Sequence, residues 1–316
     1  MARAIAAAGP ERIILLDSSE QNLFAIDRRL DADCAEVRRE AVLGSVTDAG
    51  LMDRIFARFH PRVVYHAAAL KHVPLLERNP VAAVRENALG TYTLVNAAVA
   101  HGPAVLVLIS TDKAVNPRSI MGASKRLAEL TVCATGQPRM NAVRLGNVFG
   151  STGSVVPIFR QQIRRGGPVT VTHPDAKRYF ITLREAVAAI LAAGSVDCAG
   201  RILLPDLGES RSIVDLARAL IGSREVPIRF IGLRPGEKLN EDLMYRDEAP
   251  EGRVAGGLEA IRTPVPDLSE LRARMAEIAC LLARGDLAGI LEVIRALVPE
   301  YEPSSTIRGG LGEAVP

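Results

Sequence analysis

The stretch Val105-Leu-Val-Leu-Ile-Ser-Thr111 is followed directly by Asp112-Lys113. A run this apolar predicts a strand that is buried on both faces. On either side of it, short β-branched runs alternate with longer segments of helical periodicity, which predicts a parallel sheet covered by helices on both faces. The other expected strands are 13–17, 37–42, 63–67 and 141–148, and the expected helices are 21–30, 48–59, 81–101 and 124–134.

The pattern changes after Gly150, where shorter strands and helices follow in a mixed order. We therefore expect a doubly wound α/β domain over residues 1–150 and a smaller, partly interleaved α+β domain over 151–303. Residues 304–316 are rich in Gly and Ser and are expected to form a flexible tail. The second region is expected to contain helices at 155–165, 183–193, 213–221, 268–282 and 287–297, with strands at 169–172, 202–204 and 228–231.

The composition of the 316 residues limits the class of protein. Apolar residues make up 48%, charged residues 24%, aromatic residues 4%, and the net charge is +3. These values argue against a disordered chain and against a nucleic-acid binder, which needs a basic stripe or stacking aromatics. No apolar run is long enough to span a membrane, and no signal peptide is evident. Four scattered cysteines predict neither disulfides nor a zinc site, which favours a cytoplasmic protein.

Four of the expected strand ends carry polar side chains. These are Asp17, the stretch 66–72, the stretch 110–113, and the stretch 144–147. Ligands of open parallel sheets bind beyond the carboxyl ends of the strands. The sequence therefore predicts a ligand site where these four segments meet.

Asp112 and Lys113 are the strongest candidates for chemistry. Adjacent opposite charges usually form a solvated ion pair, but a position at the end of a central strand favours a role in a ligand crevice. A carboxyl group and an amine in one site can act as acid and base if their surroundings shift their pKa values differently. Lysine is ordinarily protonated at neutral pH, so a basic role requires the pocket to lower the pKa of Lys113.

One expected feature of a nucleotide-binding sheet is missing from this sequence. Such sheets normally open with a strand, a glycine-rich turn that cradles a pyrophosphate, and a helix, but no G-x-G-x-x-G motif precedes Asp17. Residues 1–8 have the character of the helix after such a turn, and Asp17 that of the acidic residue that binds ribose. We expect the first strand and the loop to lie upstream of Met1. The alternative is a protein that never contained the loop.

A set of motifs connects this sequence with a known family. The chain resembles the extended short-chain dehydrogenase/reductases, and within them the CapD-like nucleotide-sugar 4,6-dehydratases of polysaccharide biosynthesis. Along the chain, the motifs are His66-Ala-Ala-Ala-Leu-Lys71-His72-Val-Pro74, Asn87-Ala-Leu-Gly90-Thr-Tyr92, Thr111-Asp-Lys113 with Met121 and Lys125, Arg144-Leu-Gly-Asn147-Val148, Gly150-Ser-Thr-Gly-Ser154, Gly166-Gly-Pro-Val-Thr170-Val-Thr172-His-Pro174, Arg178-Tyr-Phe180, Arg234-Pro-Gly-Glu237-Lys238-Leu239 and Val298-Pro-Glu-Tyr-Glu-Pro303.

The resemblance implies loss of water from UDP-N-acetylglucosamine or a related UDP-sugar, giving a 4-keto-6-deoxy sugar for capsule, O-antigen or glycan synthesis. Carbon 4 gives a hydride to NAD, the proton at carbon 5 is then removed, the hydroxyl at carbon 6 leaves, and the hydride returns to carbon 6. Related dTDP-glucose dehydratases have glutamate where this chain has Lys113. The resemblance therefore implies Lys113 as base, Asp112 as acid, and Thr111 as a hydrogen-bonding partner near carbon 4.

Two further positions follow from the resemblance. Met121 stands where the wider superfamily has a tyrosine base, and a thioether transfers no proton. One branch of the dehydratases resembles this sequence in having methionine there, which leaves Asp112 or a water as candidates for removing the first proton. Lys125 matches the lysine that binds the nicotinamide ribose, and its alternative is a solvent-facing helix residue.

The resemblance also implies cofactor contacts and substrate contacts. A carboxylate at Asp17 with no adjacent cation favours NAD over NADP, because a 2′-phosphate requires an arginine. Ser45 stands where relatives often have aspartate. Arginine suits a diphosphate because its guanidinium donates paired hydrogen bonds. The implied cofactor-binding residues are Asp17, Ser18, Ser45, Val46, Ala67, Ala68 and Lys125, and the implied substrate-binding residues are Lys71, Asn87, Asn147, Thr172, Arg178, Arg234 and Glu237.

No metal site is expected. His66 has no second ligand at suitable spacing and is better explained as a packed strand-end histidine. We expect a homo-oligomer, because the family tends to associate through the helices at 81–101 and 124–134. Membrane association is expected only through a segment absent from this sequence, since the related branch usually carries an N-terminal membrane region.

Two other functions remain open at the level of sequence. The missing glycine loop favours a catalytically inactive relic that binds a UDP-sugar or a partner chain without NAD. Lys113 as a base at carbon 5 would also serve a UDP-sugar epimerase, whose product keeps the mass of the substrate.

Overall fold

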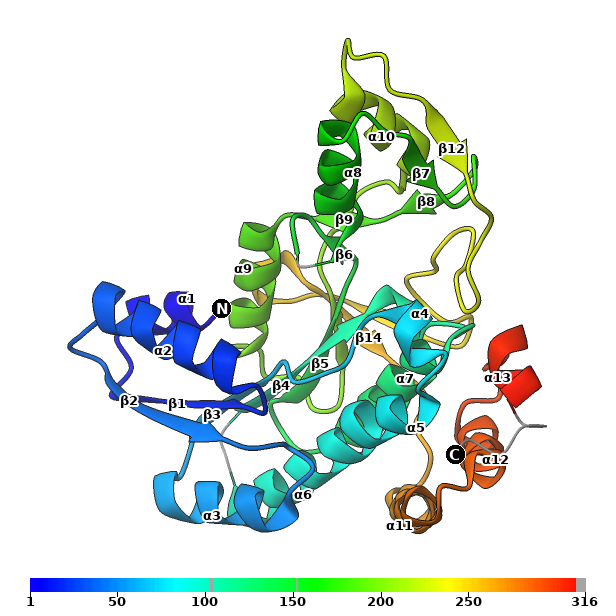
Figure 1. Ribbon diagram of the computed structural model, residues 1–316. Coiled ribbons are helices and arrows are strands. Elements are labelled where there is room, and N and C mark those ends of the chain that lie inside the picture. Colours follow the sequence, from blue (N-terminus) through cyan, green and yellow to red (C-terminus); the bar gives the residue numbers. More distant parts are fainter. Residues whose placement is uncertain (103–104, 152, 311–316) are drawn as a thin grey trace.

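The structure is a computed structural model that describes residues 1–102, 105–151 and 153–310. Its centre is a six-stranded sheet in the order β13-β14-β10-β5-β4-β3 (Figure 1). Within this sheet, β3, β4, β5 and β10 pair in parallel, and β14 and β13 complete it in antiparallel fashion. The predicted α/β class with a mostly parallel sheet is confirmed. The strands are β3 (Val63–His66), β4 (Val105–Thr111), β5 (Met140–Leu145), β10 (Ile202–Leu204), β13 (Ala249–Arg253) and β14 (Glu259–Arg262).

A second, two-stranded sheet carries the first predicted strands. Its strands pair in parallel and, within the described residues, share no ladder with the central sheet. A small apolar cluster joins them to two helices that cover one side. These four elements are α1 (Ala2–Ala7), β1 (Arg12–Asp17), α2 (Glu20–Asp33) and β2 (Arg38–Leu43).

Helices cover both faces of the central sheet. Figure 1 shows α9 on one face and α3, α6 and α7 on the other. Residues 105–108 of β4 are almost fully buried between these layers, as its unbroken apolar run predicts. The predicted helix at 81–101 is present as three consecutive helical segments. The elements are α3 (Ala49–Phe59), α4 (Val73–Leu76), α5 (Pro80–Ala83), a turn of π-helix η1 (Val84–Leu89), α6 (Gly90–His101), η2 (Asp112–Ala114), α7 (Ile120–Ala134) and α9 (Leu183–Ala193).

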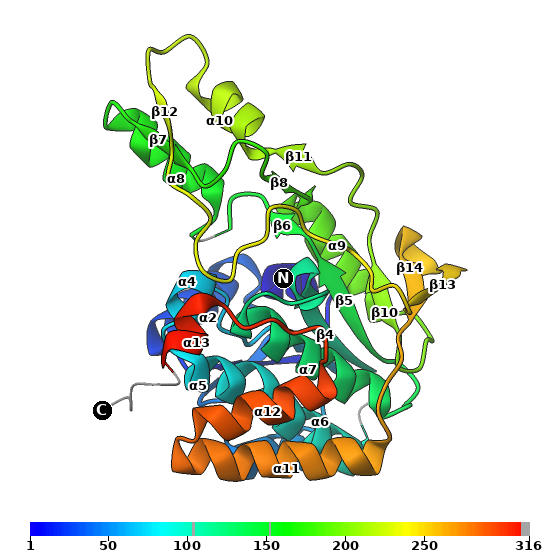
Figure 2. The ribbon, with the colours of Figure 1, turned by 90° about the vertical axis from the view of Figure 1, so that its right-hand side faces the viewer.

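Three C-terminal helices form a further layer. Figure 2 shows α11 and α12 lying outside α6 and α7. Their apolar side chains pack on α7, which is buried from Ile120 to Cys133. The chain's own helices thus cover α7, and the expected association of copies through 81–101 and 124–134 stays a prediction. The elements are α11 (Leu268–Arg284), α12 (Leu287–Leu297) and α13 (Ser305–Gly310).

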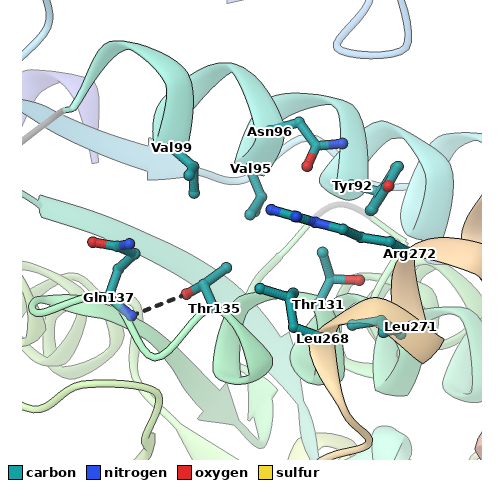
Figure 3. Close-up of a pocket in the computed structure, with 10 residues that line it drawn as sticks. All are labelled: Tyr92, Val95, Asn96, Val99, Thr131, Thr135, Gln137, Leu268, Leu271 and Arg272. Carbon is teal, nitrogen blue, oxygen red and sulfur yellow. Dashed lines mark hydrogen bonds between the residues drawn. The ribbon is translucent and has the colours of Figure 1, made fainter.

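The seam between these layers is closely packed. Figure 3 shows Arg272 of α11 lying across Tyr92 and Asn96 of α6, with Thr131 of α7 beside them. The cavity at this seam holds only about 70 Å³, well below the roughly 300 Å³ at which small-molecule pockets begin. We therefore assign it no ligand.

The prediction of a flexible tail over 304–316 is corrected for residues 305–310. Residues 305–310 form α13, and Ile307 is buried in the same cluster as α11 and α12. An apolar residue at 307 anchors a segment that its Gly and Ser content alone suggested would be loose. Residues 311–316 lie outside the described part of the chain.

A smaller lobe stands above the sheet in Figure 1. It has its own apolar cluster, formed mainly by two amphipathic helices and two paired strands. The chain leaves this lobe twice for the central layers. It does so first to form α9 and β10, and again after β12 to form β13, β14, α11 and α12. The lobe and its connections contain β6 (Asn147–Val148), α8 (Val155–Arg164), β7 (Val169–Val171), β8 (Lys177–Arg178), β9 (Phe180–Ile181), β11 (Arg211–Ser212), α10 (Ile213–Ile221) and β12 (Ile228–Phe230), whereas η3 (Ala255–Gly257) joins β13 to β14 in the central sheet.

Among the described residues, no helix combines the length and the apolarity needed to cross a bilayer.

A buried cluster of charges ties the sheet to a distant segment. The guanidinium of Arg144 on β5 is fully buried and donates to both carboxylate oxygens of Glu129 on α7 at 3.1 and 2.8 Å. It also donates to both oxygens of Glu248 at 2.8 and 3.0 Å, and to the Leu243 carbonyl at 2.8 Å. Burial would raise the pKa of Glu129, but Arg144 and Arg126 together hold it below its ordinary value.

Replacing Arg144 should destabilise the fold strongly. Arg144→Ala leaves two buried carboxylates with Arg126 as their remaining counter-ion, and the expected loss in the free energy of unfolding is about 3–5 kcal/mol. Chemical denaturation measures this loss. Arg201→Ala is the matched control, because Arg201 pairs with Glu251 at the partly exposed edge, where ion pairs contribute about 0–1 kcal/mol. Equal losses in the two variants would contradict the argument.

Candidate active site

A cleft of about 540 Å³ opens between the carboxyl ends of β3, β4 and β5 and the smaller lobe. This size suits a small organic ligand. The location is the one that the polar strand ends predict. The predicted site residues that line it are Ala67, Lys71, Thr111, Lys113, Met121, Lys125, Asn147, Thr172, Arg178, Arg234 and Glu237.

Lys113 reaches the cleft from a tight turn at the end of β4. Thr111 begins the turn, and its hydroxyl donates to the Oδ1 atom of Asp112 at 3.0 Å. The Nζ atom of Lys113 donates to the same Oδ1 atom at 2.9 Å and to Oδ1 of Asn147 at 2.9 Å. A Cβ atom on Gly122 would lie 2.2 Å from the Lys113 carbonyl oxygen, so only glycine lets α7 approach this turn.

Asp112 lies behind the cleft wall. Its side chain is fully buried, and it does not line the cleft. Its Oδ2 atom has no hydrogen-bond partner among the described residues. The prediction of Asp112 as the acid assumed direct access to a ligand, whereas the structure connects its carboxylate to the cleft only through Thr111 and Lys113.

The protonation of Lys113 differs from the expectation. Burial alone would lower the pKa of Lys113, but the carboxylates of Asp112 and Glu241 raise it above its ordinary value. A basic role requires a lowered pKa. The opposing shift comes in part from Glu241, which is remote in sequence and whose Oε1 atom lies 3.7 Å from Nζ.

Met121 and Lys125 lie on the first turns of α7, which Ser119 caps. Both line the cleft while remaining largely buried. The Nζ atom of Lys125 donates to the Ile109 carbonyl at 2.6 Å. Burial lowers the pKa of Lys125 to about 8, against the opposing charge of Glu129. The solvent-facing alternative for Lys125 is therefore wrong.

Arg178 lines the cleft, but its guanidinium is hydrogen-bonded to the protein main chain. Its guanidinium donates to the main-chain oxygens of Lys177, Lys238 and Leu239 at 2.7, 2.7 and 2.8 Å, respectively. Its Nε atom lies 3.6 Å from Oε1 of Glu241. The predicted contact with a diphosphate is thus replaced, in this arrangement, by contacts that fix the segment 238–241.

The far end of the cleft carries Arg234 and Glu237. The main-chain N–H of Arg234 donates to Oε2 of Glu237 at 3.1 Å, and its side-chain Nε donates to Oε1 at 2.8 Å. Half of the Arg234 side chain remains exposed, so its guanidinium is available to an anionic ligand.

Asn87 is placed differently from its prediction as a substrate contact. Its side chain accepts from the Leu70 N–H at 2.8 Å and donates to the Leu70 carbonyl at 2.9 Å and to Ser124 at 3.0 Å. It is fully buried. Asn87 therefore holds the loop that carries Lys71 and does not face the cleft.

The predicted cofactor residues lie at successive strand ends. Asp17 ends β1 and accepts from the Ser19 N–H at 2.8 Å, while Ser18 is exposed. Ser45 follows β2 and contacts Thr47 and Glu86. The side chain of Val46 is buried in the core, and its contact with a cofactor stays a prediction. Ala67 and Ala68 follow β3, and both are exposed.

These positions fit two parts of a dinucleotide. A partly buried carboxylate at the end of β1 suits a ribose, and Lys125 with Met121 and Ala67 forms the deeper wall near β4. No G-x-G-x-x-G motif for a pyrophosphate precedes Asp17 in the sequence. The observed donors therefore suit the two ends of the dinucleotide better than its middle.

His66 is a packed residue, as expected. It is 3% exposed, and its Nε2 atom lies 2.9 Å from the Thr91 hydroxyl. No group of three or more His, Cys, Asp or Glu side chains within the described ranges is arranged to hold a metal. Thr152, in the predicted motif 150–154, lies outside those ranges.

Sequence reasoning missed three features of the cleft. Glu241 lines it four residues after Glu237, within a segment that the motif comparison quoted only as far as Lys238. His72 lies against Gly153, whose Cβ would come within 2.4 Å of the imidazole. Phe149 and Phe180 stack with ring centroids 4.4 Å apart on the cleft wall, a pairing that no local pattern indicates.

A family model described as "Polysaccharide biosynthesis protein" matches residues 1–260. The chain belongs to this family. The protein described as "Probable polysaccharide biosynthesis protein EpsC" from Bacillus subtilis is 44% identical over 78% of this chain. The match covers 43% of EpsC, so the chain spans less than half of that relative's length.

Other relatives carry two kinds of activity in their names. A UDP-N-acetylglucosamine 4,6-dehydratase (inverting) of Campylobacter jejuni is 32% identical over 76% of this chain and 71% of its own length. A UDP-glucose 4-epimerase of Rickettsia akari is 37% identical over 81% of this chain and 78% of its own length. The chain therefore belongs to the extended dehydratase and epimerase group, as its resemblance to the extended short-chain dehydrogenase/reductases implies.

Solved structures agree on the fold. Pen from Bacillus thuringiensis has a TM-score of 0.74 and 28% identity, covering 83% of each chain. DesIV, a dTDP-glucose 4,6-dehydratase from Streptomyces venezuelae solved with NAD and TYD, has a TM-score of 0.66 and 22% identity, covering 92% of this chain and 94% of its own. The predicted Rossmann-like architecture is confirmed.

His66 should make the stability of the fold sensitive to acid. Burial, with a smaller contribution from Lys125, lowers the pKa of His66 to about 3. Between about pH 6.5 and pH 3 the unfolded chain binds a proton at this residue that the folded chain does not, so acidification costs about 1.4 kcal/mol per pH unit from this group. His66→Gln should flatten the pH dependence of the unfolding free energy by that slope. His173→Gln is the control, because His173 is partly exposed in the fold; equal slopes for His66→Gln and the parent would refute the assignment.

Proposed function

We propose that the chain is a nucleotide-sugar 4,6-dehydratase that removes water from UDP-N-acetylglucosamine. The observation that carries the proposal is the amine of Lys113, which projects into the cleft between two strand ends and is held by Asp112 and Asn147. Such an amine meets the geometric requirement for moving a proton to or from a bound sugar.

Lys113 is the residue that meets the reacting carbon in this proposal. Asp112 and Glu241 raise the pKa of its amine, so the small unprotonated fraction of that amine takes the proton. When it takes the proton from carbon 5, a positive charge develops on its amine, and the carboxylate of Asp112 at 2.9 Å stabilises that charge. Asp112 itself is enclosed, so it acts through Lys113 and through the hydroxyl of Thr111. Thr111 lines the cleft and can hold an oxygen of the sugar near carbon 4.

The cofactor of this proposal is NAD, which supplies reversible oxidation at carbon 4 when bound. Lys125, Met121 and Ala67 would hold its nicotinamide end, and Asp17 would bind the ribose at the other end. A carboxylate at Asp17 repels a 2′-phosphate, which favours NAD over NADP.

The substrate's nucleotide would occupy the side of the cleft that faces the smaller lobe. The half-exposed guanidinium of Arg234 suits a diphosphate. The stacked rings of Phe149 and Phe180 line the same cleft and present aromatic surface. Lys71 and Thr172 also line the cleft and could contact the sugar.

A UDP-sugar epimerase is the second candidate, because an epimerase is among the relatives with higher identity than the dehydratase. The two candidates differ in the mass of the product. An epimerase returns a sugar of unchanged mass, whereas a dehydratase returns one lighter by a single water.

The test is incubation of the chain with NAD and UDP-N-acetylglucosamine, followed by mass spectrometry of the nucleotide sugar. We expect a product that has lost one water, and a fall in kcat of at least about 100-fold in Lys113→Ala, because the general base is lost. Lys177→Ala is the matched control, since that side chain is exposed on β8 and does not line the cleft.

A new product of unchanged mass would replace the dehydratase by the epimerase. Absence of any product, with NAD bound or unbound, would overturn both enzymatic functions for this chain. Undiminished dehydration by Lys113→Ala would reject the residue assignment while leaving the reaction in place.

A further inference from the structure

Glu241 is a buried carboxylate on the wall of the cleft. Its side chain is 3% exposed, yet it is one of the residues that line the cleft. Its Oε1 atom lies 3.7 Å from Nζ of Lys113 and 3.6 Å from Nε of Arg178. Its Oε2 atom makes no hydrogen bond in the described part of the chain.

The position of Glu241 is built rather than incidental. Arg178 holds the main-chain oxygens of Lys238 and Leu239. The Nζ atom of Lys238 donates to the Val115 carbonyl at 2.7 Å, just beyond the turn that carries Lys113. These contacts bring the segment 238–241 onto that turn from a distance of more than a hundred residues along the chain.

Four charged groups surround the carboxylate of Glu241, namely Asp112, Lys113, Arg178 and Lys238. Asp112 and Glu241 face the amine of Lys113 from two different elements, and Arg178 faces both Lys113 and Glu241. Lys238 lies 4.0 Å from the Oε2 atom of Glu241. Burial raises the pKa of Glu241, while Lys113 opposes the shift. A carboxylate is kept here, at a cost in desolvation, beside an amine that already has one counter-ion.

We propose that Glu241 is a positioning residue for Lys113, the second carboxylate that holds its amine in the cleft and controls whether it carries a proton. The proposal deepens the proposed function and rests on it for the catalytic consequence. When the C–H bond at carbon 5 breaks, the proton joins the nitrogen of Lys113 and the electron pair stays on the sugar. Glu241 then stabilises the ammonium that forms, together with Asp112.

Direct titration of Lys113 tests the pairing without any turnover. The sequence has five lysines, and cleavage after arginine leaves each in a separate peptide. Trace acetylation with acetic anhydride over a range of pH reports each amine by mass spectrometry, with exposed Lys177 as internal reference. In Glu241→Gln we expect the titration of Lys113 to move about one unit lower, because one of two nearby negative charges is gone.

Two variants make the test specific. Asp242→Asn removes the neighbouring carboxylate, which pairs with Lys238 and Asn116 instead of Lys113, and should leave the titration of Lys113 in place. Glu241→Asp keeps the negative charge and should leave the titration of Lys113 close to that of the parent chain. An unchanged titration in Glu241→Gln, or an equal shift in Asp242→Asn, would overturn the proposal.

The pH profile of dehydration provides the second readout. In Glu241→Gln the ascending limb of kcat/KM should move to lower pH by about one unit, while the plateau falls about tenfold. A fall in the plateau with no movement of the limb would indicate a merely structural role and would overturn the proposal. A shift in labelling without dehydration by the parent chain would support the pairing and reject the dehydratase alone.

Discussion

The guanidinium of Arg144 is the interaction on which the arrangement of the cleft depends. It is buried with two carboxylates, and each of them comes from a different part of the chain, Glu129 from α7 and Glu248 from the segment before β13. Together with Arg126, it compensates the charge of these two buried carboxylates. Because Arg144 also holds the Leu243 carbonyl, the chain that leaves the smaller lobe is fixed beside the end of β5.

That anchor explains how the cleft acquires its third wall. The strand pairing places Thr111 opposite Leu145, so Lys113 and Asn147 emerge side by side at one edge of the sheet. The sheet alone would leave this edge open on the side of the smaller lobe. The segment that ends at Leu243 closes it, and the Tyr245 hydroxyl and Lys238 each donate to a carbonyl just beyond Lys113.

The sequence was sufficient for features that depend on local pattern. The apolar run of β4 and the polar residues after it predicted both the central strand and the edge at which the cleft lies. The periodicity of α9, α10 and α12 predicted their bounds as found. The sequence was insufficient where long-range contacts decide. Asn87 and Arg178 belong to matched motifs, but their hydrogen bonds go to the main chain of remote loops. The same long-range contacts bring Glu241 beside Lys113, so no local sequence pattern could predict that pairing.

Lys113 and Lys125 show why residue type does not determine protonation here. Both amines line one cleft and both lose water contacts on folding. Lys125 donates to an uncharged carbonyl, and Glu129, the carboxylate that acts on it, is already neutralised by Arg144 and Arg126, so burial dominates and its pKa falls to about 8. Lys113 has two carboxylates beside it, so their charge outweighs burial and its pKa rises.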